Sequence, residues 1–169
     1  KDDDKWICVF NRDSSYLNKI YPNQYPSSKK NWSYHNFRNF SVSSLRSAAE
    51  FFASKGYFVL RMGAVVKEKF ICNNSKIIDY ANSSFRNDFN DIYLLSNCVA
   101  CFGGDTGINT IPLMFKKPMY TINFSSTNIN IMTKYCPWLF TIKRIRNNGN
   151  GKLLTMKDIL NSEIAYSAD

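Results

Sequence analysis

The chain has 169 residues, enough for one domain with a hydrophobic core and marginal for two. It carries 22 Lys and Arg against 13 Asp and Glu, and the resulting net charge of +9 favours anionic partners such as nucleic acid, a membrane surface or phosphorylated small molecules. No apolar window reaches the roughly 18 residues of a membrane span, and the scattered basic residues form no recognised nucleic-acid-binding signature. We therefore expect no specific nucleic-acid partner.

The first residue and the cysteines bear on the origin of the chain. It begins with Lys1 rather than Met, so we expect a piece of a longer or processed protein. The five cysteines are scattered and odd in number, which is typical of reduced thiols in a cytoplasmic protein. Cys98 and Cys101 flank an expected strand, where residues three apart point to opposite faces. With a single histidine in the chain, no structural zinc site is expected.

In the first third of the chain, apolar runs of strand length alternate with a helical pattern. Trp6–Phe10 predicts a strand, and a polar and aromatic stretch over residues 14–40 predicts a long loop, which in a compact domain is usually functional. A helix is expected to begin at Ser43 and to stop at Gly56. Residues 57–60 predict the next strand.

The rest of the chain continues this alternation. We expect a strand at 77–78, a helix at 88–98, a strand at 99–102, a glycine turn at 103–107, a helix at 108–117, strands at Met119–Phe124 and 139–142, and a capped helix at 155–161. Strands that alternate with helices predict an α/β fold with right-handed crossovers. The fold class expected is a single Rossmann-like domain over residues 1–169, with a mostly parallel sheet and helices on both faces.

The segment from Gly103 to Gly107 joins an expected strand to an expected helix. At such a junction the first N–H groups of the helix lack partners and the helix dipole is positive, so the place suits a phosphate or diphosphate. Asp105 supplies a carboxylate there, suited to sugar or ribose hydroxyls or to helix capping.

Ligands of such sheets bind outside the carboxyl ends of the strands. This rule places four short segments on one rim, although they are scattered in the sequence: Asn11-Arg12-Asp13, Arg61-Met62-Gly63, Asp79-Tyr80 and Gly103-Gly104-Asp105-Thr106-Gly107. Arg12 can contact two phosphate oxygens with its planar guanidinium, and Arg61 could provide a second contact. The sequence therefore predicts a ligand site at this rim.

Several of these motifs resemble known glycosyltransferases. Gly103-Gly104-Asp105-Thr106-Gly107, followed by Pro112 and Lys117-Pro118, looks like the nucleotide-sugar site of GT-B glycosyltransferases, of which the heptosyltransferases are examples. Asn11-Arg12-Asp13 also resembles the strand-end arginine of fucosyltransferases. A bacterial family of surface-polysaccharide glycosyltransferases is similar at residues 11–17, 32–39, 78–81 and 85–94. The similarity spans about residues 6–124.

The resemblance implies the C-terminal, donor-binding half of a cytoplasmic GT-B enzyme, acting near the inner face of the cell membrane. Its partners would be a nucleotide-diphosphate sugar, a glycan or lipid-linked acceptor and an acceptor-binding N-terminal half, with peripheral membrane contact and no metal or other cofactor. Catalytic roles fall on Arg12, Asp13 and His35, because the reaction needs a cation for the leaving diphosphate and a base for the acceptor hydroxyl. Donor-binding roles fall on eight residues: Arg61, Asp79, Tyr80, Gly103, Gly104, Asp105, Thr106 and Gly107.

Three other functions stay open at this point. A nucleotide-sugar epimerase shares the GT-B architecture and would need no acceptor. A nucleotide- or glycan-binding module without activity, or a basic scaffold for anionic partners, would need neither catalytic group. The base, the sugar, the acceptor and the stereochemical course are also open.

Overall fold

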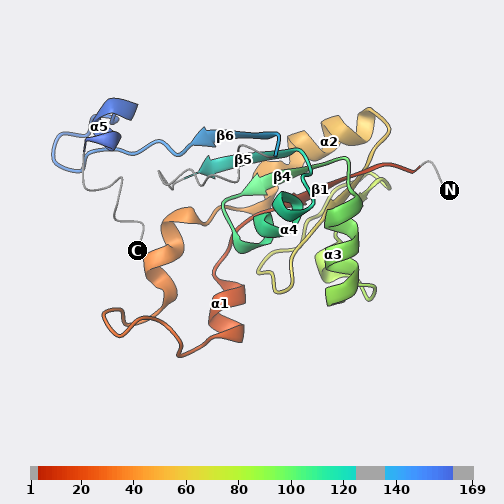
Figure 1. The fold of residues 1–169 in the computed structure, drawn as a ribbon, viewed down its shortest axis with the longest axis horizontal. Coiled ribbons are helices and arrows are strands. Elements are labelled where there is room, and N and C mark those ends of the chain that lie inside the picture. Colours follow the sequence, from red (N-terminus) through yellow and green to blue (C-terminus); the bar gives the residue numbers. More distant parts are fainter. Residues whose placement is uncertain (1–3, 125–135, 162–169) are drawn as a thin grey trace.

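The structure, a computed structural model, describes residues 4–124 and 136–161. Residues 1–3, 125–135 and 162–169, which the expected domain of 1–169 includes, lie outside the described residues. The strands form a six-stranded sheet in the order β3-β2-β1-β4-β5-β6, and every pairing between neighbours is parallel. This is an α/β, Rossmann-like fold, and it confirms the expected class (Figure 1).

The six strands lie close to where the apolar runs predict them. Their bounds are β1 Trp6–Phe10, β2 Phe58–Arg61, β3 Ile77–Ile78, β4 Ala100–Gly104, β5 Met119–Phe124 and β6 Trp138–Ile142. The α-helices are α1 Ser15–Ile20, α2 Arg46–Ser54, α3 Asp88–Asn97, α4 Thr110–Met114 and α5 Met156–Leu160. Four 3₁₀ helices accompany them: η1 Trp32–Arg38, η2 Val42–Leu45, η3 Tyr80–Asn82 and η4 Gly107–Asn109.

Helices cover both faces of the sheet. Successive side chains of β1 point to opposite faces and all but the first are buried, so both faces must be covered. Ile7 and Val9 pack on one face with Leu45 and with Ala49 of α2. Cys8 points to the opposite face and packs in the cluster that includes residues of α3 and α4. Figure 1 shows α2 on one side of the sheet and α3 and α4 on the other.

Three expectations of the sequence are wrong in detail. The expected glycine turn begins later, because Gly103 and Gly104 are the last residues of β4. The expected helix at 108–117 is the 3₁₀ helix η4 followed by the five residues of α4, and the positive φ of 53° at Lys116 ends it. The expected loop at 14–40 contains α1 and η1.

The two cysteines of the C-x-x-C pair do not point to opposite faces. Cys98 is the C-cap residue of α3, so the alternation of a strand does not apply between Cys98 and Cys101. Their sulfur atoms lie 3.5 Å apart, and both side chains are buried beside the buried Cys8. All three are free thiols, and burial raises the pKa of Cys8.

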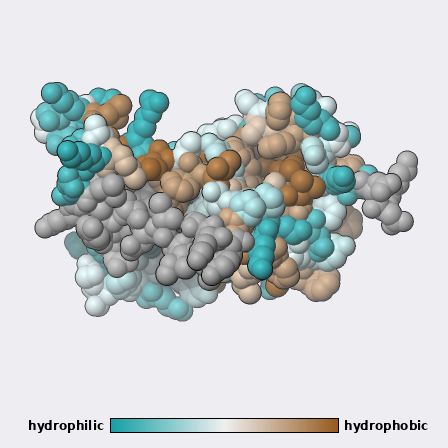
Figure 2. Space-filling view, turned by 45° about the horizontal axis from the view of Figure 1, so that its top comes forward, coloured by the Kyte–Doolittle hydropathy of each residue, from teal (hydrophilic) through white to brown (hydrophobic). Residues whose placement is uncertain are grey.

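Large hydrophobic side chains also lie at the surface, among them Phe85 and Phe89 near the start of α3 and Leu139 on β6. On the face drawn in Figure 2, brown and teal residues are intermingled. In the described ranges, no helix is long and apolar enough to cross a membrane.

Candidate functional site

A cavity of about 570 Å³ opens at the carboxyl ends of β1, β2 and β4. The sheet order changes direction between β1 and β4, since β2 and β3 follow on one side and β5 and β6 on the other. A parallel sheet places its ligand crevice at this kind of switch point, because the loops after the two strands diverge. The cavity is therefore the candidate functional site.

Arg12 follows β1 and lines this cavity. The residue has an exposed fraction of only 8%, and the single hydrogen bond of its side chain with a described residue is the one that Nη1 donates to Asn39 Oδ1 over 2.8 Å. No carboxylate among the described residues forms an ion pair with it. Burial and the neighbouring Arg38 cation lower the pKa of Arg12. None of the other N–H groups of the Arg12 side chain is among the buried polar atoms without a partner, so they are accessible from the cavity and could bind an anionic ligand.

The segment that follows η1 is fixed to the end of β1. The Phe40 N–H donates to the Arg12 carbonyl oxygen, and Asn11 Nδ2 donates to the Phe40 carbonyl oxygen over 2.9 Å. A Cβ at Gly104 would lie 2.4 Å from Cε1 of Phe40, so only glycine leaves room for this ring. The sequence 39–40 thereby holds η1 over the cavity.

His35 and Arg38 enter the cavity from η1. Arg38 Nη2 donates to His35 Nδ1 over 2.8 Å, because a guanidinium has no acceptor. The imidazole ring also stacks on Trp32 with an interplanar angle of 14°. Burial, Arg38 and Arg12 lower the pKa of His35 to about 4. At neutral pH the ring is uncharged and carries its proton on Nε2.

Of the segment from Gly103 to Gly107, only the last two residues line the cavity. Thr106 and Gly107 line it, and the Thr106 hydroxyl caps η4 by accepting from the Ile108 N–H over 3.2 Å. Asp105 lies beside the cavity residues, with Oδ2 4.0 Å from Arg38 Nη1. Gly103 and Gly104 are buried in β4 and serve packing, since a Cβ at Gly103 would lie 2.2 Å from the Phe10 carbonyl oxygen.

Asp13 lines the cavity as well, but both oxygens of its carboxylate have backbone partners. Oδ1 accepts from the Ser15 N–H over 2.8 Å and Oδ2 from the Lys67 N–H over 2.9 Å. These bonds connect the start of α1 to the loop that follows β2. Asp13 therefore stabilises the backbone at the cavity edge, whether or not it also takes part in chemistry.

Arg61, Asp79 and Tyr80 lie apart from the cavity, although the sequence places them on the same rim. Arg61 is fully buried, and its Nη1 contacts Asp79 Oδ1 at 3.1 Å. Asp79 also accepts from the Phe70 N–H over 2.9 Å. Tyr80 is 5% exposed and packs in the core against Leu95 and its neighbours. These three residues therefore contribute an ion pair and core packing, and they do not line the cavity.

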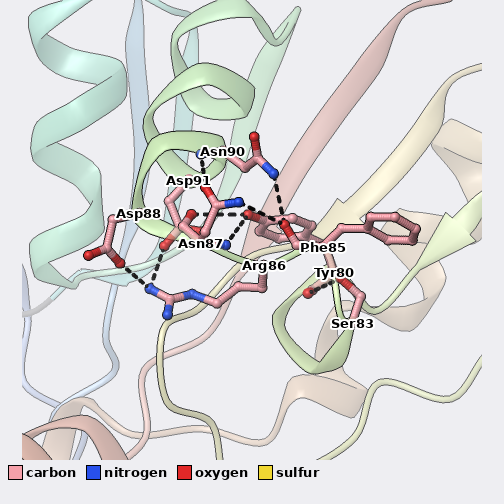
Figure 3. A network of polar contacts seen from close by, with 8 residues as sticks. All are labelled: Tyr80, Ser83, Phe85, Arg86, Asn87, Asp88, Asn90 and Asp91. Atoms are coloured by element: carbon pink, nitrogen blue, oxygen red, sulfur yellow. Dashed lines mark hydrogen bonds and ion pairs between the residues drawn. The ribbon is translucent and has the colours of Figure 1, made fainter.

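A polar network at the start of α3 borders the cavity through Asp91 (Figure 3). Arg86 Nη2 lies 2.8 Å from both Asp88 Oδ1 and Asp91 Oδ2. Asn87 caps the helix by accepting from the Asn90 N–H over 2.8 Å. The network ties the loop before α3 to its first turn, and it sets one acidic side chain in the cavity wall.

Several cavity residues are not assigned to the site from the sequence, among them Trp32, Arg38 and Asp91. Trp32 and Arg38 lie in the aromatic stretch that the sequence marks as a functional loop, so a search for cations in that stretch would have found Arg38. Asp91 looks like a residue that decorates a helix, and only the packing of α3 reveals its position. Among the described residues, no group of three or more His, Cys, Asp or Glu is arranged to hold a metal ion.

Comparisons of the chain with protein-family models, with curated proteins and with solved structures found no match. Any function assigned to the chain consequently rests on the residues of the cavity.

Proposed function

We propose that the cavity binds the diphosphate of a nucleotide sugar and that the chain is the donor-binding domain of a GT-B-type glycosyltransferase. The observation that carries this proposal is Arg12, a cation with 8% exposure, a single side-chain hydrogen bond to a described residue and a place in the cavity wall. Its remaining N–H groups suit phosphate oxygens, which accept charge-assisted hydrogen bonds strongly.

The surroundings of Arg12 support a diphosphate rather than a single carboxylate. Arg38 comes from a separate element and adds a second guanidinium to the same cavity. Met62, Ile108 and Ile111 line the cavity as apolar residues, which strengthens electrostatic attraction by excluding water. A volume of about 570 Å³ falls in the range of small-molecule and cofactor sites.

The roles in sugar transfer follow from charge. The bond between the anomeric carbon and the diphosphate oxygen breaks, a glycosidic bond to the acceptor oxygen forms, and the acceptor proton leaves to a base. Arg12 and Arg38 stabilise the negative charge that grows on the leaving diphosphate. Thr106, which lines the cavity, and Asp105, which lies beside it, would meet hydroxyl groups of the donor. The acceptor, a surface glycan or a lipid-linked sugar, comes from the other half of the enzyme, at the inner face of the membrane.

The test is a calorimetric titration of the folded domain with UDP, GDP, ADP and CMP and with their common sugar conjugates. We expect one diphosphate nucleotide to bind selectively, and CMP, which has a single phosphate, to bind weakly. Substitution Arg12→Met should remove this binding, whereas Arg46→Met, on the exposed start of α2, should leave it unchanged. Binding that is indifferent to Arg12→Met would refute the proposal.

A further inference from the structure

The tautomer of His35 is fixed by its neighbour. Arg38 Nη2 lies 2.8 Å from His35 Nδ1 and can only donate, so the lone pair of Nδ1 is occupied. A neutral imidazole has one proton, and here it must be on Nε2. An additional proton on Nδ1 would compete with the Arg38 hydrogen bond and would add a third positive charge near Arg12 and Arg38.

The ring is also held in orientation. It stacks on Trp32 with centroids 5.9 Å apart, and the Tyr34 ring lies against it with centroids 4.0 Å apart. Nε2 bonds to none of the described residues, and it is not one of the buried polar atoms without a partner. This N–H therefore remains accessible in a residue that lines the cavity.

We propose that His35 donates its Nε2–H to an oxygen of the bound diphosphate, and that Arg38 fixes the imidazole for this task. The inference rests on the proposed diphosphate site, and it gives His35 a role different from the base expected from the sequence. A base needs a free lone pair, and neither ring nitrogen offers one in this arrangement. The base for the acceptor hydroxyl must come from another group.

A neutral donor suits a site that already holds two guanidiniums. It adds a directed hydrogen bond to the anion without further repulsion between cations. The charged groups that act on the ring are Arg38 of the same 3₁₀ helix and Arg12 at the end of β1, and both keep it neutral. Anion binding should therefore not need a protonated histidine.

The single histidine of the chain makes the test direct. The domain is labelled with ¹⁵N-histidine, and the two ring nitrogens are observed by NMR from about pH 5 to about pH 8. We expect a protonated Nε2 and an unprotonated Nδ1 throughout. Addition of inorganic pyrophosphate should shift the Nε2–H resonance and leave Nδ1 unprotonated.

Two substitutions of His35 separate hydrogen bonding from packing. The side-chain NH₂ of glutamine can occupy about the position of Nε2–H, whereas leucine has no donor. We expect His35→Leu to weaken pyrophosphate binding about tenfold, and His35→Gln to restore most of that loss. Far-ultraviolet circular dichroism checks that both variants are folded.

The outcomes distinguish this inference from the proposed function. An Nδ1–H tautomer, or an imidazolium at neutral pH, would overturn the donor role. So would pyrophosphate binding that requires Arg12 but leaves the His35 resonances unchanged, and in that case the diphosphate site would stand. If pyrophosphate fails to bind the folded domain at all, the proposed function and this inference both fail.

Discussion

Two arginines at the ends of neighbouring parallel strands, Arg61 in β2 and Arg12 just after β1, have opposite surroundings. Both are buried, with exposed fractions of 0% and 8%. Arg61 donates to Asp79, to the Glu68 carbonyl oxygen and to Asn11. Arg12 donates only to Asn39 among the described residues and faces the cavity. Burial alone therefore does not distinguish the two arginines. Arg12 is the candidate ligand-binding residue because it has few protein partners and lines the cavity.

This difference divides the rim into two parts. We call the part around Arg61 the framework side, because its polar groups bond to each other, and the part around Arg12 the candidate ligand side, because it faces the cavity. Around Arg61, bonds to Asn11 after β1, to Asp79 after β3 and to the loop at Glu68 close the sheet edge. Around Arg12, the protein provides a second cation and apolar walls but no carboxylate within ion-pair distance in its described part. Asp13 and Asp105 act on Arg12 only from beyond ion-pair distance, and a diphosphate would supply an anion in direct contact with it.

The largest effect is expected at Arg61. Substitution Arg61→Met removes the buried guanidinium and leaves the partly exposed Asp79 carboxylate without its ion pair, and it should lower the free energy of unfolding by about 3 kcal/mol. Urea unfolding followed by tryptophan fluorescence measures the loss. The double variant Arg61→Met/Asp79→Asn should recover part of it, and a purely additive loss would show that the ion pair is unimportant.

A pair of glycines provides the next test. Gly103→Ala places a Cβ 2.2 Å from the Phe10 carbonyl oxygen, so the backbone must move, and we expect a loss of about 2–3 kcal/mol. Gly107→Ala is the matched control, because a methyl group there would meet no atom within 4 Å and the φ of Gly107 is not in the left-handed region. Equal stability of the two variants in thermal unfolding would contradict this division between framework and ligand side.

Arg12→Met should behave differently from Arg61→Met. Removing a buried cation that has few partners relieves its desolvation, so the free energy of unfolding should stay constant or rise by about 1 kcal/mol. Pyrophosphate in large excess over its Kd should raise the melting temperature of the unsubstituted domain but not of this variant. A strong destabilisation by Arg12→Met would assign Arg12 to the framework.

The smallest effect concerns pH. The folded-state pKa of His35 is about 4 and its ordinary value is 6.5, so between these values the unfolded chain binds a proton that the native chain does not. The free energy of unfolding should therefore fall as the pH decreases from 6.5 towards 4, by less than about 1 kcal/mol after allowance for solvent screening. His35→Gln should lack this part of the pH dependence. An identical slope in both proteins would refute the lowered pKa.

The fold could be predicted because each strand is a compact apolar run and each longer helix has a helical period. Gly103 and Gly104 could not be assigned to β4 in this way, since glycine indicates a turn and its use here depends on Phe10 and Phe40. The closeness of Cys98 and Cys101 depends on where α3 ends, because Cys98 caps this helix and Cys101 lies in β4. The hydrophobic period of the sequence does not fix that boundary.

The sequence predicts which edge of the sheet carries the candidate site, but not which residues of that edge line the cavity. The carboxyl-end rule finds both Arg12 and Arg61, but it cannot separate them, because the partner Asp79 follows Arg61 by 18 residues and reaches it through β3. Arg38 could be singled out as a cation of the 14–40 stretch but could not be placed in the cavity, since its position depends on the bonds that Asn39 and Phe40 make with the end of β1. The roles of these residues therefore emerge from tertiary contacts.

The central claim is that Arg12 binds an anionic ligand, and calorimetry with inorganic pyrophosphate tests it most directly. The unsubstituted domain, Arg12→Met and Arg46→Met are titrated under identical salt, after each is shown to be folded. We predict that the unsubstituted domain and Arg46→Met bind alike, and that Arg12→Met binds about 100-fold more weakly. Equal affinity of all three proteins, or no binding by any of them, would contradict the claim.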